Sequence, residues 1–241
     1  MTQPLIGIIC CHKTLANYGI QEAHDSYINA IVEAGGIPIL LPQQLNHCAQ
    51  RDQLFAQLDG ILLTGSASNV SPFHYHATHA EPHSDLGRDT LSFHLLAYAR
   101  DHDLPLLAIC RGHQEMNVFF GGTLTPDWRK KEQYYLPHLE NETDPLAVQY
   151  QEVHDICIHR GGILADFGTT AMVNSLHQQA IDKLAPALFL EASASDGMME
   201  AISLPEHRFM LGVQWHPEFN SGVRLLSRYI FERFFAAIQN R

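Results

Sequence analysis

The chain alternates short, continuous apolar runs with segments of helical length, and this alternation constrains its fold more than any other feature. Residues 5–10, 38–41, 60–63 and 105–110 are apolar runs without the polar alternation of a strand that has one wet face. Segments 24–34, 50–58 and 87–100 separate them and have the length of helices. Strands joined by helices form βαβ units, so we predict a doubly wound α/β fold with a mostly parallel sheet flanked by helices.

The second half of the chain is less regular. Residues 128–150 are polar, contain two prolines and show no period, which predicts an extended loop over one end of the sheet. Strand character returns at residues 153–159, 188–192, 199–204 and 209–215, and residues 223–238 have apolar side chains at helical spacing. A length of 241 residues without an internal repeat predicts a single domain over residues 1–241.

Charge, apolar runs and cysteines exclude several classes of protein. A net charge of −11 without a basic stripe argues against binding to nucleic acid or to an anionic membrane. No apolar run approaches the roughly 18 residues of a membrane span, and the first residues lack a secretory signal, so we expect a cytoplasmic protein. Five cysteines without a Cys-x-x-Cys pair also favour a reducing compartment.

Residues 106–115, Leu-Leu-Ala-Ile-Cys-Arg-Gly-His-Gln-Glu, are typical of a nucleophile at a strand-to-helix turn. The apolar strand ends on Cys110, a small residue stands two before it, and Gly112 stands two after it. Such a turn exposes the thiol at the carboxyl edge of the sheet, beside a helix N-terminus that stabilises the thiolate. Cys110 is therefore a candidate nucleophile, although a cysteine buried at a strand end has the same local pattern.

A second strand near the C-terminus supplies the partner that such a nucleophile needs. Residues 211–218, Leu-Gly-Val-Gln-Trp-His-Pro-Glu, end on His216 and Glu218. Histidine is the usual base for a thiol at neutral pH, and a carboxylate can fix its tautomer. The combination, rather than any one of the 16 histidines, points to a Cys-His-Glu catalytic set.

These two motifs together resemble the class I glutamine amidotransferase superfamily, and the resemblance spans almost the whole chain. Residues 63–75, 174–179 and 195–202 are similar to one branch, the stand-alone gamma-glutamyl-gamma-aminobutyrate hydrolases of putrescine breakdown. The chain departs from the superfamily at Ala108, where glycine is common before the cysteine, and at Ser66, where a second glycine often stands.

The resemblance implies a flavodoxin-like amidotransferase fold and hydrolysis of a small gamma-glutamyl amide through a thioester, without a metal or organic cofactor. Cys110, His216 and Glu218 would be catalytic, and the backbone N–H groups of Ser66 and Arg111 would bind the oxyanion. The resemblance further suggests substrate contacts from Gly65, Asn69, Tyr75, Gln114, Ser175 and His177. The sequence does not determine the oligomeric state, and a homodimer is compatible with it.

Three other functions remain open from the sequence. The same fold could serve as a glutaminase subunit that delivers ammonia to a separate synthetase. A cluster of histidines, His74, His76, His79 and His83, could instead bind zinc, although the spacing matches no helix face. A binding module that has lost catalysis is the third alternative, against which the intact Cys-His-Glu set argues.

Overall fold

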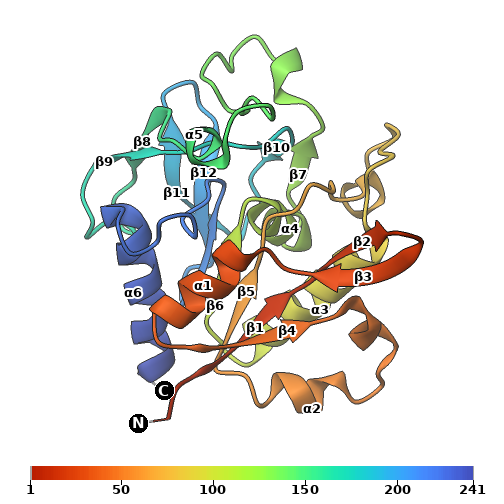
Figure 1. Cartoon of the computed structure of the whole chain (residues 1–241). Coiled ribbons are helices and arrows are strands. Elements are labelled where there is room, and N and C mark those ends of the chain that lie inside the picture. The colour runs from red at the N-terminus through yellow and green to blue at the C-terminus, as the bar shows by residue number, and fades with distance from the viewer. Residues whose placement is uncertain (1, 241) are drawn as a thin grey trace.

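The computed structural model describes residues 2–240 and is built on a nine-stranded sheet with the strand order β4-β1-β5-β6-β13-β12-β11-β8-β9 (Figure 1). The strands are β1 (Leu5–Ile9), β2 (Cys11–Leu15), β3 (Tyr18–Glu22), β4 (Ile37–Leu41), β5 (Gly60–Leu63), β6 (Leu106–Ile109), β7 (Thr123–Thr125), β8 (His154–Ile158), β9 (Thr170–Val173), β10 (Ala180–Lys183), β11 (Phe189–Ala194), β12 (Met199–Ser203) and β13 (Met210–Val213). The helices are α1 (Asp25–Glu33), α2 (Arg51–Phe55), α3 (Leu86–Asp101), α4 (Arg111–Phe119), α5 (Leu146–Gln149) and α6 (Leu225–Gln239), with short 3-10 helices η1 (Gln43–His47), η2 (Pro72–Tyr75) and η3 (Trp128–Lys130).

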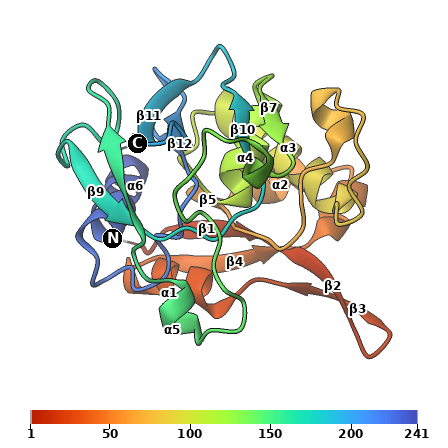
Figure 2. The same ribbon diagram turned by 90° about the horizontal axis from the view of Figure 1, so that it is seen from above.

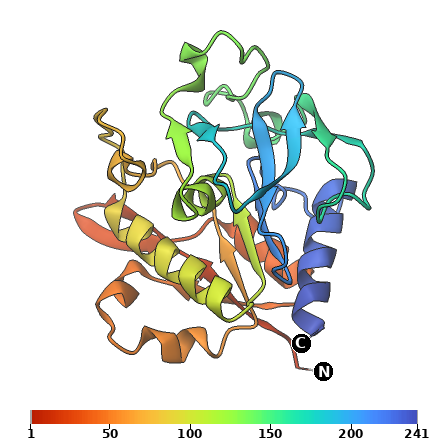
Figure 3. The ribbon, with the colours of Figure 1, turned by 180° about the vertical axis from the view of Figure 1, so that it is seen from behind.

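Strands β4, β1, β5, β6 and β13 are parallel to one another, and helices cover both of their faces. Helices α1 and α6 pack on one face, where Ile31 and Phe234 belong to the same buried apolar cluster as Ile8 of β1. Helices α2, α3 and α4 cover the other face, as seen from behind in Figure 3. Burial on both faces explains why β1, β5, β6 and β13 are continuous apolar runs, whereas the edge strand β4 leaves Ile37 and Leu40 exposed. The predicted doubly wound α/β fold is confirmed.

The other half of the sheet is antiparallel, which the apolar pattern did not indicate. Strand β12 pairs antiparallel with β13 and β11. Strand β8 in turn pairs antiparallel with β11 and β9. Three further features were also not predicted: the hairpin β2–β3, the edge strand β9 and the two-stranded sheet of β7 and β10. Their strands are short or polar, so their residues show no apolar run.

The segment of residues 128–150 passes over the carboxyl ends of the strands, as predicted, but it is not a simple polar loop. It contains η3 and α5, and it buries Trp128, Tyr134 and His138. Trp128 and Tyr134 pack with Met198 in a small apolar cluster of their own. Seen from above, α5 lies beside the start of α1 (Figure 2), and Leu146 and Tyr150 share a surface hollow with His24. This segment therefore forms part of the wall at that edge of the sheet.

The parallel strands deliver the candidate chemical groups to one edge. Strand β5 ends before Thr64, β6 ends before Cys110, and β13 leads after two residues to His216. Strand β6 lies between β5 and β13 and is parallel to both, so their carboxyl ends are neighbours. Within residues 2–240, no helix combines the length and apolarity required to cross a bilayer.

Candidate active site

Cys110 sits in a strained turn between β6 and α4. Its backbone has φ 51° and ψ −100°, a conformation that non-glycine residues rarely adopt, and its N–H donates to the Val213 carbonyl at 2.7 Å. Gly112 is required two residues later, because a Cβ there would lie 2.6 Å from the carbonyl oxygen of Leu63. The turn therefore has the geometry of a nucleophile elbow, with the thiol at the helix N-terminus.

Two residues hold His216: Asn174, which is remote in sequence, and Glu218, which follows two residues later. The side chain of Asn174 accepts a hydrogen bond from the His216 N–H (2.8 Å) and donates one to its carbonyl (3.1 Å). The ring Nδ1 lies 2.8 Å from Glu218 Oε1, and both side chains are buried. Because Nδ1 faces the carboxylate, Nε2 is the ring nitrogen left for the substrate side.

The charges around His216 favour its protonated form. Burial alone would lower the pKa of the imidazole, but the Glu218 carboxylate and a Cys110 thiolate outweigh burial and hold this pKa well above its ordinary value. Burial, together with the same two charges, also raises the pKa of Tyr27 well above its usual range, so the phenol stays neutral. The site is therefore suited to a thiolate–imidazolium pair beside a neutral phenol.

Cys110 and His216 line one pocket of about 200 Å³. Gly65 lies between them, since a Cβ built there would be 2.9 Å from His216 Cε1 and 3.5 Å from Cys110 Cβ. The hydroxyl of Tyr27 accepts a hydrogen bond from the Gly65 N–H at 2.9 Å and lies 3.3 Å from His216 Nδ1. Gly65 therefore cannot carry a side chain, and its N–H already has an acceptor.

Ser66 also lines this pocket, next to Gly65. It is absent from the residues of positive φ among residues 2–240, so the position does not need the conformational freedom of glycine. Its hydroxyl accepts a hydrogen bond from the Ser68 N–H at 3.1 Å, which stabilises the loop locally. The N–H of Arg111 is the first in α4, where helix geometry leaves it without an intrahelical acceptor.

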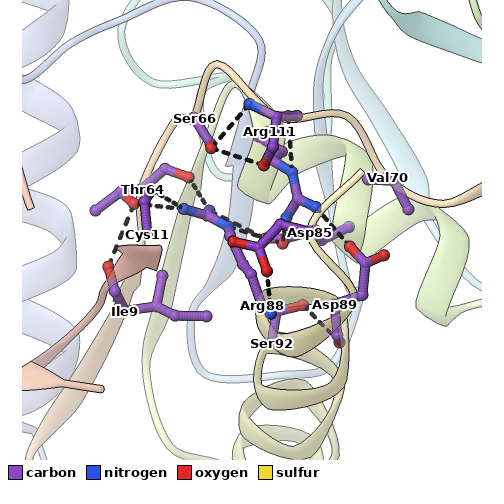
Figure 4. A network of polar contacts seen from close by, with 12 residues as sticks. Ile9, Cys11, Thr64, Ser66, Val70, Asp85, Arg88, Asp89, Ser92 and Arg111 are labelled. Atoms are coloured by element: carbon purple, nitrogen blue, oxygen red, sulfur yellow. Dashed lines mark hydrogen bonds and ion pairs between the residues drawn. The ribbon is translucent and has the colours of Figure 1, made fainter. Parts of the chain in front are cut away.

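A buried arginine under the pocket holds the start of the loop that follows β5 (Figure 4). Arg88 is fully buried in α3 and donates to the Thr64 hydroxyl at 3.0 Å, to the Thr64 carbonyl, and to the Gly65 carbonyl at 3.3 Å. Its charge is balanced by Glu115 of α4, which accepts from Arg88 Nε at 3.1 Å and from Nη2 at 3.3 Å. The two helices thereby determine where Gly65 lies.

Arg111 holds the rest of that loop from the elbow itself. Its guanidinium donates to the carbonyls of Ser68 (2.9 Å) and Asn69 (3.1 Å). It pairs with Asp89 at 2.6 Å and also with Glu115, so one carboxylate serves both buried arginines. The residue after the nucleophile thus links the elbow to the loop of residues 64–71.

The structure does not bring the other expected substrate contacts to the pocket. None of the following five residues is among those that line it, and their polar atoms contact neighbouring protein groups: Asn69 with Glu81, Tyr75 with His79 and Gln179, Gln114 with Gln179 and Gln214, Ser175 with His138, and His177 with Gln179. These polar side chains therefore bond to protein groups outside the pocket lining. Gly65, by contrast, does line the pocket.

Sequence reasoning missed several residues of the pocket and its support. His24, Tyr27, Glu140, Gln149 and Tyr150 line the pocket, and Tyr150 stacks edge-on against His216 with 5.4 Å between ring centroids. The only signal for Glu140, Gln149 and Tyr150 was their place in the segment predicted to cover this edge. Nothing in the local pattern distinguishes the support residues Asn174, Arg88 and Asp89, because their role depends on distant partners.

The histidine-rich loop does not gather its side chains around one point. His74 lies 3.5 Å from Asp89, and His79 contacts the Tyr75 hydroxyl. Within residues 2–240, the four histidines at positions 74, 76, 79 and 83 belong to no group of three potential metal ligands. Among the described residues, this loop therefore does not form the zinc site considered from the sequence.

Comparisons with known proteins show which family this chain resembles. Residues 4–218 match the Peptidase C26 family. The gamma-glutamyl-gamma-aminobutyrate hydrolase PuuD of Escherichia coli (strain K12) is 41% identical over 243 residues, an alignment that covers 100% of this chain and 95% of that protein. A glutamine amidotransferase-like protein of Rickettsia prowazekii (strain Madrid E) is 34% identical over 260 residues, with 90% and 92% covered.

A solved structure supports the fold. A GMP synthase protein from Thermoplasma acidophilum superposes with a TM-score of 0.65 at 18% identity, over 100% of this chain and 96% of that chain. At that identity the likeness concerns the fold alone. The full-length relatives and the match over residues 4–218 show that the chain belongs to the Peptidase C26 family.

Proposed function

We propose that this protein hydrolyses the gamma-glutamyl amide bond of gamma-glutamyl-gamma-aminobutyrate, as a step of putrescine breakdown, with Cys110 as nucleophile. The proposal rests on one observation above all: Cys110 and His216 flank Gly65 in a single pocket, with Glu218 2.8 Å behind the imidazole. The 41% identical relative is named for this substrate.

In the first half of the reaction, His216 Nε2 holds the proton of the Cys110 thiol, and the thiolate attacks the gamma-carbonyl carbon. The carbonyl oxygen becomes an oxyanion, for which the N–H groups of Ser66 and Arg111 are the donors, since the Gly65 N–H is occupied by Tyr27. The C–N bond then breaks as the imidazolium protonates the leaving nitrogen. The amine departs and a thioester to Cys110 remains.

In the second half, water attacks the thioester and gives its proton to His216. The C–S bond breaks, the thiolate is restored beside the imidazolium, and glutamate is released. Glu218 takes no proton in this scheme, because it orients the ring and stabilises its positive charge in both halves.

Glu140 is our candidate for recognition of the glutamyl group. Its Oε2 is buried without a hydrogen-bond partner among residues 2–240, and the residue lines the pocket. A carboxylate in that setting would suit the alpha-ammonium group of a gamma-glutamyl substrate. We expect Glu140→Gln to raise KM more than it lowers kcat.

A glutaminase that supplies ammonia to another enzyme is the second candidate, since the same relatives include a protein named for glutamine amidotransferases. The two functions differ in the leaving group, ammonia or a larger amine. Rates with glutamine, gamma-glutamyl-gamma-aminobutyrate and other gamma-glutamyl amines, measured on the isolated chain, distinguish them. A preference for free glutamine would reject the proposed substrate.

The catalytic roles are tested by variants in the same assay. Cys110→Ala should lower kcat on the order of 10⁴-fold or more, and Glu218→Gln should cost less than His216→Asn. Cys48→Ala is the matched control, because that thiol is exposed and does not line the pocket. Near-normal turnover by Cys110→Ala would refute the nucleophile assignment.

A further inference from the structure

Three buried side chains outside the active-site pocket converge from three separate segments. His138 comes from the covering segment of residues 128–150, His154 begins β8, and Glu200 lies in β12. Each has less than 5% of its surface exposed, and one ligand atom from each lies within 4.8 Å of the other two. Glu200 Oε1 is 3.4 Å from His138 Nδ1 and 3.6 Å from His154 Nε2.

Three of the inward-facing atoms of this cluster lack hydrogen-bond partners among residues 2–240. His154 Nε2 and both carboxylate oxygens of Glu200 are buried and accept or donate no hydrogen bond among residues 2–240. A carboxylate in such a place is strongly disfavoured unless a proton or a cation joins it. The cluster therefore requires either a proton on Glu200 or a cation at its centre.

The outward-facing atoms, by contrast, are fixed as they are in known metal sites. His138 Nε2 lies 2.9 Å from Asp196 Oδ2, and His154 Nδ1 lies 3.3 Å from the carbonyl oxygen of Asp155. A ring nitrogen that donates its hydrogen outward leaves the other nitrogen with a lone pair directed inward. The inward-facing His138 Nδ1 lies 3.3 Å from Ser175 Oγ.

The geometry points to a binding site for a divalent transition-metal ion at His138, His154 and Glu200, and we propose that zinc occupies it. Zinc binds imidazole and carboxylate ligands at about 2.0–2.2 Å, which places two ligand atoms of a tetrahedral site about 3.3–3.5 Å apart. The distances from Glu200 Oε1 to His138 Nδ1 (3.4 Å) and to His154 Nε2 (3.6 Å) are close to this range. Glu200 and Asp196 together carry two negative charges, which equal the charge of the ion. The chemistry proposed at Cys110 needs no metal, so this site is a separate, structural one.

Its role follows from the segments that it joins. The ion would tie the covering segment to β8 and β12, beneath the wall that carries Glu140 and Tyr150 into the pocket. Ser175, which contacts His138, is followed by Leu176 of the pocket wall and preceded by Asn174, which holds His216. The ion would thus stabilise the covering segment and the loop behind the catalytic histidine.

The first test is the metal content of the untagged full chain, equilibrated with zinc or cobalt(II), desalted, and analysed by inductively coupled plasma mass spectrometry. We expect about one ion per chain, and less than about a tenth of that in Glu200→Gln and in His154→Asn. The matched control is His76→Asn, which removes an exposed histidine of the histidine-rich loop and should keep the ion. Cobalt-loaded protein should show the visible absorption of a tetrahedral site, and this absorption should disappear in Glu200→Gln.

The second test is thermal unfolding with and without a chelator. Chelation should lower the Tm of the unaltered protein and leave the Tm of Glu200→Gln unchanged, and it should speed protease cleavage within residues 128–150. If the unaltered chain retains no ion, Glu200 is instead protonated and the proposal is overturned. Equal metal content in Glu200→Gln, His154→Asn and the unaltered chain would also overturn it. Neither readout depends on turnover, so failure here leaves the proposed hydrolase function untouched.

Discussion

Glu115 is the residue whose change best tests how the loop beside the nucleophile is held. It is fully buried and is the shared carboxylate of two buried arginines, Arg88 and Arg111. Glu115→Gln keeps the shape of the side chain but removes its charge. Asp89 then remains as the carboxylate paired with Arg111, and it makes no ion pair with Arg88.

The expected cost can be worked out from this burial. Removing one partner of a buried ion pair typically costs about 3–5 kcal/mol, because the other charge stays buried without compensation. For a chain of 241 residues, the unfolding entropy is about 0.5 kcal/mol/K, from about 2.1 cal/mol/K per residue. The Tm should therefore fall by about 6–10 °C.

The matched control is Glu232→Gln, which breaks a pair of the same type with Arg228 on the surface of α6. That pair is at 3.7 Å, with side chains 53% and 68% exposed, so its loss should cost no more than about 0.5 kcal/mol, or about 1 °C. Calorimetry measures the Tm of Glu115→Gln, of Glu232→Gln and of the unaltered chain. Turnover should also fall in Glu115→Gln, by roughly 10- to 100-fold in kcat, because the loop of residues 64–71 loses its anchor.

Equal Tm values for Glu115→Gln and Glu232→Gln would refute the reasoning. A large loss of stability with unchanged kcat would show that the arginines support the fold but do not position the loop. In that case the displacement of Gly65 and Ser66 would have to be too small to matter for turnover.

Three further predictions concern the same edge of the sheet and its support. Asn174→Ala removes both hydrogen bonds to the His216 backbone, so stability should fall by about 1–3 kcal/mol in urea unfolding and kcat should fall with it. Gly65→Ala would place a methyl group 2.5 Å from Tyr27 Oη, and the resulting displacement should cost about 10²-fold in kcat in steady-state assays. Burial lowers the pKa of His113 to about 4, whereas the unfolded side chain titrates near 6.5. As the pH drops, the unfolded chain therefore binds a proton at this histidine before the folded chain does. The free energy of unfolding should fall by up to about 3 kcal/mol between about pH 6.5 and about pH 4. In urea unfolding at several pH values, this fall should be less steep for His113→Asn.

What the sequence determined by itself is local. Continuous apolar runs specified the buried parallel strands, because burial on both faces leaves no room for polar alternation. The pattern around Cys110 predicted a strained elbow, since the turn needs Gly112 and a helix that starts at once. His216 and Glu218 were likewise predicted as a pair at the end of one strand, and the structure places the carboxylate 2.8 Å from the ring.

What the tertiary structure decided depends on partners that are far apart along the chain. The arginine network joins Arg88 and Arg111 to a loop more than 20 residues away, and the cluster of His138, His154 and Glu200 joins three segments. The resemblance suggested Asn69 and Gln114 as substrate contacts, whereas in the structure their side chains form hydrogen bonds with other protein groups. Pairing between distant segments leaves no periodicity or spacing in the sequence, because only the packing of the sheet and its covering segment brings these groups together.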